Sequence, residues 1–170
     1  TAEREAVLAA LNGVLGDYLA DTGNGLAIPM RLRVGGSPLT LRSESIAAAV
    51  PAPRSRLLLR VHGLCMNDRQ WSQRALRAAG LPAASAAGAE PWQALAGALG
   101  ATLLDVHYNT GRHVSTNGRA LAELLDQLAQ QWPVPVCEIV IVGHSMGGLV
   151  ARSACVHAAA TGGGWLPRLR

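Results

Sequence analysis

The pattern of apolar and polar positions predicts three strands and their connecting helices from residue 56 onward. Each strand is a short run of mostly Leu, Ile or Val, and each is followed by residues with helical spacing. The strands are expected at 56–61, 101–108 and 138–142, with helices at 69–79, at 91–99, between 115 and 132, and after 147. For the third of these helices, Ser115 or Asn117 is the expected N-cap. Strands that are nearly continuously apolar and alternate with helices predict an α/β fold, with a mostly parallel sheet, right-handed crossovers and helices on both faces.

Residues 1–55 have a different pattern, which predicts one helix and a pair of antiparallel strands. The helix, over 4–19, is expected to be amphipathic, and its apolar side chains are Val7, Leu8, Leu11, Val14, Leu15, Tyr18 and Leu19. Strands over 28–34 and 39–42 are joined by G-G-S-P, which is typical of a hairpin turn. The interval 43–55 contains two prolines and is expected to be a connection. The interval 80–91, rich in Ala, Gly and Pro, is expected to be a loop.

Composition indicates one globular domain and disfavours two kinds of binding site. The chain has 170 residues, of which 49% are hydrophobic and 15% charged, which is sufficient for a core. The net charge of +4 comes from arginines that are scattered, without a basic run interleaved with aromatic residues, so nucleic-acid binding is not expected. The three cysteines, Cys65, Cys137 and Cys155, have no C-x-x-C spacing, and we expect reduced thiols and no metal site. Abundant Ala, Gly and Arg without any Lys are typical of a GC-rich, bacterial genome.

The sequence says little about cellular location. No apolar run reaches the length of a membrane span, so we expect no integral membrane segment. No signal peptide is visible, which favours the cytoplasm, but the chain begins at Thr1 without Met and removal of a leader stays open. The oligomeric state is open as well.

The pattern G-x-S-x-G occurs at residues 143–147, between the last strand and the last helix. Strand, sharp turn and helix in this order are the context of a nucleophile elbow. We expect Ser145 at the tip of the turn, in a strained backbone conformation that exposes its hydroxyl. Gly143 and Gly147 lack a Cβ and would let the strand and the helix approach closely. His144 is expected to point away from the site.

A serine nucleophile needs a general base and hydrogen-bond donors for the oxyanion of the tetrahedral intermediate. The backbone N–H of Met146 follows the serine at a helix N-terminus and is the first expected donor. The second is the N–H of Leu64, in the H-G-L sequence after the first parallel strand, where Gly63 lets the backbone turn. His62 is expected to anchor this loop in preference to acting as the base.

These motifs together resemble the α/β-hydrolase fold, in its lipase and esterase branch. The resemblance rests on V-H-G-L at 61–64 and V-G-H-S-M-G-G at 142–148. In addition, Y-N-T-G-R-H at 108–113 with N-G-R at 117–119 is similar to a bacterial group of PGAP1-like hydrolases. The resemblance extends over most of the chain. It implies hydrolysis of a carboxylic ester, of a small molecule or a lipid, through an acyl-enzyme on Ser145 and without a cofactor.

The sequence departs from this family after the nucleophile. In α/β-hydrolases the acid and the histidine of the triad follow the serine. No Asp or Glu follows Ser145, and the one later histidine, His157, lies about 18 Å along the expected helix. We therefore expect residues 1–170 to be a single, incomplete α/β-hydrolase domain without the C-terminal strands that carry the acid and base. Such a piece is expected to be inactive alone and prone to aggregate, because its last strand is an apolar edge.

For the other polar residues near the expected strand ends, a structural role is expected in preference to a catalytic one. These are Asn67, Asp68, Asp105, His107, Arg112 and His113. Asp105 and His107 share one face of a strand by the period of two and are expected to be hydrogen-bonded within the sheet. For Arg112 and His113, which follow the same strand, a place in a substrate wall stays open.

Two further functions use the same residues. A thioesterase or acyltransferase would differ only in its leaving group or acceptor. A non-catalytic α/β-hydrolase-like module for binding or assembly is the alternative from a different class, and it is motivated by the absence of the acid and base.

Overall fold

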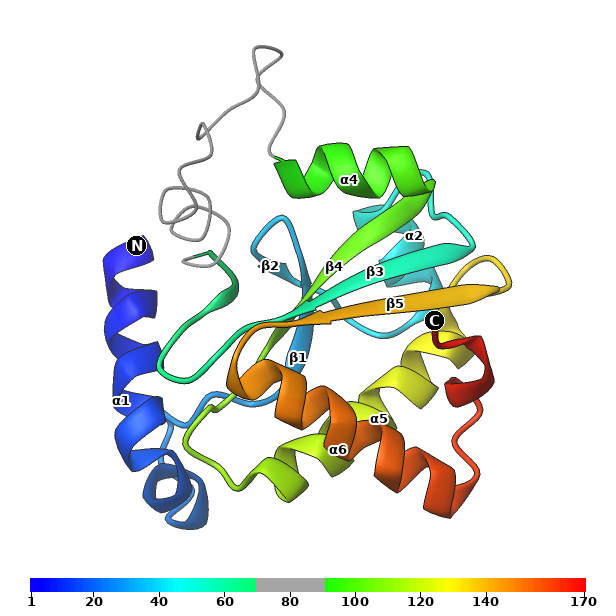
Figure 1. The fold of residues 1–170 in the computed structure, drawn as a ribbon. Coiled ribbons are helices and arrows are strands. Elements are labelled where there is room, and N and C mark those ends of the chain that lie inside the picture. Colours follow the sequence, from blue (N-terminus) through cyan, green and yellow to red (C-terminus); the bar gives the residue numbers. More distant parts are fainter. Residues whose placement is uncertain (70–90) are drawn as a thin grey trace.

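The computed structural model describes residues 1–69 and 91–170, which form a sheet with helices on both faces (Figure 1). The helix expected over 69–79 and the loop expected over 80–91 fall almost entirely outside the described residues. The elements along the chain are α1 (Ala2–Asp21), β1 (Arg31–Val34), β2 (Ser37–Pro38), α2 (Ser43–Ala49), β3 (Arg56–Val61), α4 (Pro91–Leu99), β4 (Ala101–His107), α5 (Val114–Gln131), β5 (Glu138–Gly143), α6 (Met146–Thr161) and the 3-10 helix η1 (Leu166–Arg168).

In the described part of the chain, five strands form one sheet in the order β2-β1-β4-β3-β5. The central strand β3 is parallel to β4 on one side and to β5 on the other. At the C-terminal end of β3, Val61 lies opposite Val106 of β4 and Gly143 of β5. The strand β1 pairs antiparallel with both β4 and β2. The prediction of an α/β fold with a mostly parallel centre and an N-terminal antiparallel pair is confirmed.

Alternate side chains of β3 face two different apolar layers, as the pleat of a strand requires. Leu57, Leu59 and Val61 belong to the larger core, which also contains buried residues of α2, α5 and α6. Leu58 faces the other side, where it packs with Ala96 of α4 and with residues of β4. The sheet is therefore covered on both faces, which explains why its parallel strands are mostly apolar.

The helix α1 lies across the C-terminal ends of the parallel strands (Figure 1). Its backbone comes very close to the loops that leave β3 and β4. A Cβ placed on Gly13 would lie 2.2 Å from the Sγ of Cys65, and one placed on Gly16 would lie 2.8 Å from the Cα of Gly111. Glycine at positions 13 and 16 therefore allows this helix to pack against loop backbone.

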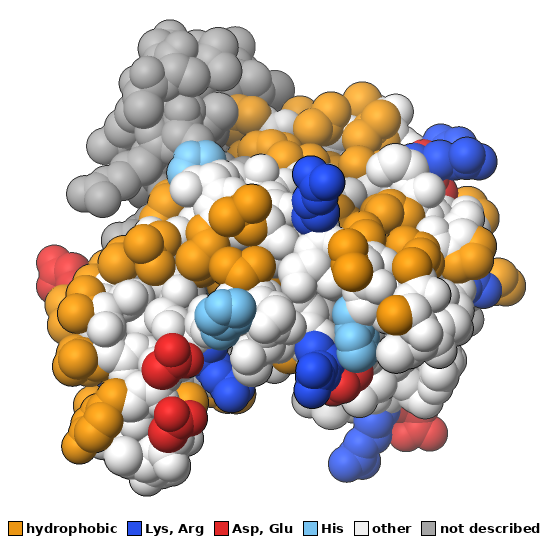
Figure 2. All heavy atoms as spheres, turned by 60° about the horizontal axis from the view of Figure 1, so that its bottom comes forward, with side chains coloured by type: hydrophobic (Ala, Val, Ile, Leu, Met, Phe, Trp, Pro, Cys, Tyr) orange, Lys and Arg blue, Asp and Glu red, His pale blue; other side chains and the backbone are white. Residues whose placement is uncertain are grey.

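The prediction of a helix near the N-terminus is confirmed, but its predicted apolar face is not the buried one. Val14 is 78% exposed and Tyr18 is 65% exposed. Of the predicted face, Leu19 is buried, and the other buried residues are Ala9, Asn12 and Gly16. Small residues face inward because the helix packs on loop backbone. The Asn12 side chain donates a hydrogen bond to the carbonyl oxygen of Leu26 and accepts one from the N–H of Ile28. Figure 2, in which α1 lies at the left, shows hydrophobic side chains exposed along that edge.

The antiparallel strands are shorter than predicted. The first covers Arg31–Val34 instead of 28–34, and the second covers only Ser37–Pro38 instead of 39–42. The reversal is made by Gly35 and Gly36, whose φ angles are +56° and +81°. The turn consists of these two glycines alone. The second strand therefore begins at Ser37, earlier than the start at residue 39 that the G-G-S-P pattern suggested.

Two predictions about helices are also wrong. The interval 43–55, expected to be a connection, contains α2, which is stabilised by the burial of Ile46 in the larger core. The helix α5 begins at Val114, and its N-cap is His113, not Ser115 or Asn117. The Nδ1 of His113 accepts a hydrogen bond from the backbone N–H of Ser115 at 3.3 Å, the part that a Ser or Asn side chain usually plays.

The outer edge of β5 is contacted at one point by the C-terminal residues. Leu169 forms a parallel bridge with Ile139, and the N–H of Arg170 donates to the carbonyl oxygen of Ile139 at 3.0 Å. Within residues 1–69 and 91–170, no helix has the length and apolar character needed to cross a bilayer.

Two arginines of β3 each pair with a carboxylate directly opposite in the sheet, but in very different surroundings. Arg60 is buried and forms two hydrogen bonds with Asp105 of β4, at 2.7 and 3.0 Å. Its guanidinium also lies 5.3 Å from the centre of the Trp92 ring. Arg56 pairs with Glu138 of β5 at 3.1 Å, with more than half of its side chain exposed.

We expect Asp105→Ala to lower the free energy of unfolding by about 3–5 kcal/mol, because the buried Arg60 loses this carboxylate. Glu138→Ala is the matched control and should cost at most about 1 kcal/mol, since solvent screens the exposed pair. Urea denaturation at neutral pH measures both. Equal losses in the two variants would contradict the assignment of Arg60–Asp105 as the structurally important pair.

Candidate functional site

Ser145 lies in the sharp turn between β5 and α6 and is exposed to solvent. Its φ and ψ angles are 52° and −124°, and its side chain makes no capping hydrogen bond to the helix. A positive φ strains any residue other than glycine, and it orients the side chain away from the adjoining strand and helix. This geometry is the one expected of a nucleophile elbow.

The elbow requires glycine on both sides of Ser145. A Cβ on Gly147 would lie 2.1 Å from the carbonyl oxygen of Val61, the last residue of β3. A Cβ on Gly143 would lie 2.6 Å from the backbone of Gly148. The first turn of α6 therefore packs directly against the end of β3, and both glycines permit the close approach that the sequence predicted.

The loop that follows β3, residues 62–65, lies beside the candidate nucleophile. A Cβ on Gly63 would be 3.2 Å from the Cβ of Ser145 and 2.9 Å from Nδ1 of His144. His144 is exposed, and it lies over this loop. Leu64 is 51% exposed, and Cys65 has a positive φ of 58°. The sequence motifs H-G-L and G-H-S-M-G are thus neighbours in space.

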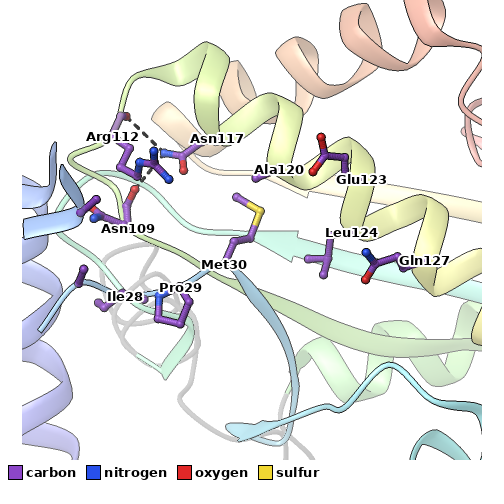
Figure 3. A pocket seen from close by; sticks show the side chains of 12 residues that line it. Ile28, Pro29, Met30, Asn109, Arg112, Asn117, Ala120, Glu123, Leu124 and Gln127 are labelled. Atoms are coloured by element: carbon purple, nitrogen blue, oxygen red, sulfur yellow. Dashed lines mark hydrogen bonds between the residues drawn. The ribbon is translucent and has the colours of Figure 1, made fainter. Parts of the chain in front are cut away.

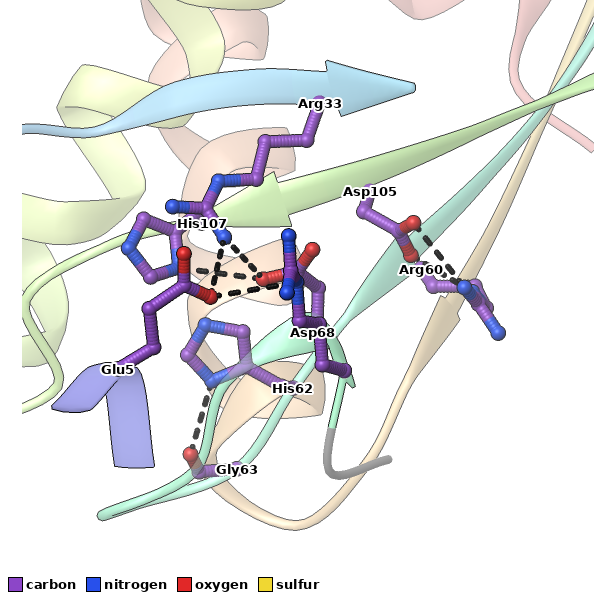
Figure 4. A network of polar contacts seen from close by, with 9 residues as sticks. Glu5, Arg33, Arg60, His62, Gly63, Asp68, Asp105 and His107 are labelled. Carbon is purple, nitrogen blue, oxygen red and sulfur yellow. Dashed lines mark hydrogen bonds and ion pairs between the residues drawn. The ribbon is translucent and has the colours of Figure 1, made fainter. Parts of the chain in front are cut away.

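His62, the first residue of this loop, has a fully buried side chain. Its ring stacks on Tyr108 with 4.6 Å between ring centres, and its Nδ1 lies 3.1 Å from the carbonyl oxygen of Gly63 (Figure 4). Burial lowers the pKa of His62 to about 4, so the ring is neutral at pH 7. These contacts agree with a structural role for His62.

A buried polar cluster lies next to His62 and joins four segments, α1, β1, the residues after β3, and β4 (Figure 4). Asp68 accepts from Arg33 of β1 at 3.0 Å, and its Oδ1 lies 3.4 Å from Nδ1 of His107. Arg33 and Arg69 also each lie 3.3 Å from Glu5 of α1. Burial alone would raise the pKa of Asp68, but the His107 contact and the Arg33 charge lower it below its ordinary value. Asp68 is therefore an ionised, buried side chain that holds β1 and β4 to the segment after β3.

The segment after β4 is tied down by asparagine side chains. Asn109 donates to the carbonyl oxygen of Gly16 in α1 at 2.9 Å, and its Oδ1 accepts from the N–H of Gly111 at 3.0 Å. Asn117 of α5 donates to the carbonyl oxygens of Asn109 and Arg112. Asn117, predicted as an N-cap, instead connects α5 to this segment.

The two backbone segments that carry the expected oxyanion donors adjoin Ser145. Met146 is the first residue of α6, and an N–H at that position has no partner within the helix. Leu64 follows Gly63, on which an added Cβ would lie 3.2 Å from the Cβ of Ser145. Across the described residues, no side chain hydrogen-bonds to the Ser145 hydroxyl. His157, within α6, lies about 18 Å along the helix from Ser145.

Two hollows described in the structure lie apart from the elbow. The larger, of about 550 Å³, lies between the segment 27–30 and α5 (Figure 3). Arg112, Asn109 and Asn117 gather at one end of it, and Met30 and Leu124 face its middle. The smaller, of about 260 Å³, is lined by α1 residues together with Arg33 and His107. Within the described ranges, no three His, Cys, Asp or Glu side chains are grouped for binding a metal ion.

Sequence reasoning missed the residues that support the 62–65 loop. The Tyr108 hydroxyl donates to the carbonyl oxygen of His62 at 2.7 Å, and the Thr110 hydroxyl accepts from the N–H of Cys65 at 3.1 Å. The motif Y-N-T-G-R-H was noticed as a family resemblance, without a physical role. The available signal was its position, since it follows a parallel strand at the edge where functional loops meet.

Comparison with known proteins gives one match. The family model described as "PGAP1-like alpha/beta domain" matches residues 54–163, which is more than half of the chain. The match covers β3 through α6, and so includes both the 62–65 loop and the elbow. Neither the curated proteins nor the solved structures contain a significant match.

The adjacent glycines 147 and 148 offer a sharp test of the elbow. We expect Gly147→Ala to lower the free energy of unfolding by about 2–3 kcal/mol, because its Cβ would meet the Val61 backbone. Gly148→Ala should leave stability unchanged or raise it by up to about 1 kcal/mol, because its Cβ meets no atom closer than 3.8 Å and alanine favours helix. Thermal or urea unfolding measures both, and similar effects in the two variants would refute the packing described.

The low pKa of His62 makes a prediction about acid. The unfolded chain takes up a proton on this residue near pH 6.5, whereas the folded protein does so only near pH 4. Stability is therefore lost as the pH falls from about 6.5 to 4. Between pH 7.5 and 5.0 we expect His62 to account for a loss of about 2 kcal/mol.

The variant His62→Phe keeps an aromatic ring against Tyr108 but cannot take up the proton. Its free energy of unfolding, measured in urea at both pH values, should fall by about 2 kcal/mol less than that of the wild type. The same fall in both proteins would show that His62 is not the acid-sensitive group.

Proposed function

Because the chain belongs to the PGAP1-like α/β domain family, we propose that it is a serine hydrolase that cleaves carboxylic esters through an acyl-enzyme on Ser145. The family and the α/β fold support hydrolase-type chemistry in general. The esterase or lipase activity, on a small-molecule or lipid ester, is our proposal from the site.

One observation carries the proposal, which is the conformation of Ser145 next to the 62–65 loop. An exposed serine with a φ of 52° at the start of a 16-residue helix is a costly arrangement, and strained residues gather at functional sites. Gly63, in the loop that follows β3, lies so close that a Cβ placed on it would be 3.2 Å from the Cβ of Ser145. A serine with a purely structural role would need neither the strain nor this neighbour.

The proposed reaction begins when Oγ of Ser145 attacks the ester carbonyl carbon and its proton passes to a general base. The carbonyl oxygen becomes an oxyanion, which accepts hydrogen bonds from the N–H groups of Met146 and Leu64. The alcohol then leaves with the proton, and water attacks the acyl-enzyme to release the acid. The positive end of the α6 dipole favours the oxyanion at the Met146 side.

The general base and its carboxylate are a separate part of the proposal. No acidic residue follows Ser145 in this sequence, and His157 lies about three turns along α6. In α/β-hydrolases the acid and the histidine follow the nucleophile in the chain. We therefore assign neither group to a residue of this sequence.

A fluorophosphonate probe applied to the full-length protein that carries this chain tests the nucleophile. We expect one labelled serine, found by peptide mass spectrometry at Ser145, and loss of at least about 95% of labelling in Ser145→Ala, since the probe requires an activated hydroxyl. Ser153→Ala, on the same helix, is the matched control and should label like the wild type. Labelling that persists without Ser145, or a wild type that does not react, would contradict the proposal and favour a non-catalytic binding module.

A further inference from the structure

The 62–65 loop is held in a conformation that its own residues do not favour. Cys65 has a φ of 58°, in the left-handed region that favours glycine. Leu64, which supplies the proposed oxyanion donor, lies immediately before it and is half-exposed, so little packing restrains its side chain. In the peptide group of the Leu64 N–H, the Gly63 carbonyl oxygen lies 3.1 Å from Nδ1 of His62 and accepts from the Met66 N–H at 3.3 Å. The orientation of the Leu64 N–H depends on these contacts and on what holds the neighbouring backbone.

Two hydrogen bonds restrain the peptide groups on either side of this N–H. The Tyr108 hydroxyl donates to the carbonyl oxygen of His62, which belongs to the peptide group between residues 62 and 63. The Thr110 hydroxyl accepts from the N–H of Cys65, which belongs to the peptide group between residues 64 and 65. The Leu64 N–H belongs to the peptide group between them. Tyr108 and Thr110 are both buried, so water does not compete for these bonds.

The segment that makes these bonds, residues 108–110, is itself firmly supported. Between Tyr108 and Thr110, Asn109 bonds to α1, and Asn117 of α5 bonds to the Asn109 carbonyl. Burial raises the pKa of the Tyr108 hydroxyl, which keeps the proton that it donates. The 108–110 segment is thus held by α1 and α5, and it in turn holds the loop beside Ser145.

We propose that Tyr108 and Thr110 are positioning residues, which hold the 62–65 loop so that the Leu64 N–H is oriented for the oxyanion. This inference rests on the proposed function, because it assumes that Leu64 donates to an oxyanion in the reaction of Ser145. It goes beyond that function by assigning a role to two residues that do not touch the substrate.

Thr110→Val removes the acceptor for the Cys65 N–H with almost no change of shape, and Tyr108→Phe removes the donor to His62. In the full-length protein, with a water-soluble short-chain p-nitrophenyl ester, we expect kcat to fall about tenfold in each variant while KM stays within about twofold, because the oxyanion is bound only in the transition state. Thr110→Ser keeps the hydroxyl and should restore kcat to within about twofold of the wild type.

The chain offers matched controls. Thr102 accepts a hydrogen bond from the N–H of Arg54 at 3.0 Å, at the opposite end of β4, so Thr102→Val removes the same kind of bond away from the site. Tyr18 is exposed, so Tyr18→Phe controls for the loss of a tyrosine hydroxyl. Both controls should keep the wild-type kcat and KM.

Amide hydrogen exchange gives a second readout that does not depend on activity. Peptides that cover residues 62–66 should exchange at least about fivefold faster in Thr110→Val and Tyr108→Phe, with β5 and α6 unchanged, because the loop opens locally. Unchanged exchange in both variants would overturn the inference, whether or not the protein is an enzyme.

The outcomes separate this inference from the proposed function. If the wild type hydrolyses the ester in a Ser145-dependent way but both variants keep wild-type kcat, the positioning role is wrong and the hydrolase proposal stands. If the wild type shows no Ser145-dependent hydrolysis, the catalytic role of both residues falls with the proposed function. Faster amide exchange in the variants would then support only the conclusion that Tyr108 and Thr110 hold the loop in place.

Discussion

The candidate site depends on the close approach of α6 to the end of β3. Gly147, in the first turn of the helix, leaves no room for a side chain against the carbonyl oxygen of Val61. To bring the helix this near, the chain must reverse within two residues after β5, and Ser145 takes the strained φ of 52° that this requires. The strain, of about 1–2 kcal/mol, is offset by the burial of Val150 and Ala154 of α6 against the sheet.

The second strained residue of the described chain lies in the loop beside the first. Cys65 and Ser145 are the two non-glycine residues with positive φ in residues 1–69 and 91–170, and Cys65 belongs to the 62–65 loop, whose Gly63 adjoins Ser145. Their loops leave adjacent parallel strands at the same edge of the sheet, which is where ligands bind in open α/β folds. The scaffold beneath them is rigid and well packed. Strain is therefore localised where chemistry is proposed and is supported by the surrounding structure.

Buried polar groups support this edge from below. Asp68 pairs with Arg33 and contacts His107, while His62 is kept neutral by burial. Buried ion pairs add little net stability, since desolvation of the charges offsets their attraction. These buried ion pairs instead determine how the segments are arranged, because a buried charge is stable only next to its partner. The cluster thus fixes how α1, β1 and the residues after β3 meet, and the 62–65 loop lies above that junction.

The main elements of the sheet could be predicted from the sequence, and those of the N-terminal part less well. The runs at 56–61 and 138–142 are mostly apolar because both faces of the sheet are covered, and this signal is strong. The helix α1 was predicted as an element but with the wrong buried face, because Gly13 and Gly16 face loop backbone. Short strands and α2 were misjudged because a few residues carry too little periodicity to separate a turn from an element.

For the site, the sequence by itself determined the nucleophile motif, its glycines and the H-G-L loop, because each is a local pattern read within a few consecutive residues. Only the tertiary structure decided that Tyr108 and Thr110 support that loop, and that His113 caps α5. It also decided that Asp68 and His107 join one buried cluster. The His113 cap is local, but the contacts of Tyr108, Thr110 and His107 link residues about 40 or more positions apart. Their physical cause is the parallel sheet, which brings the C-terminal ends of distant strands to one edge.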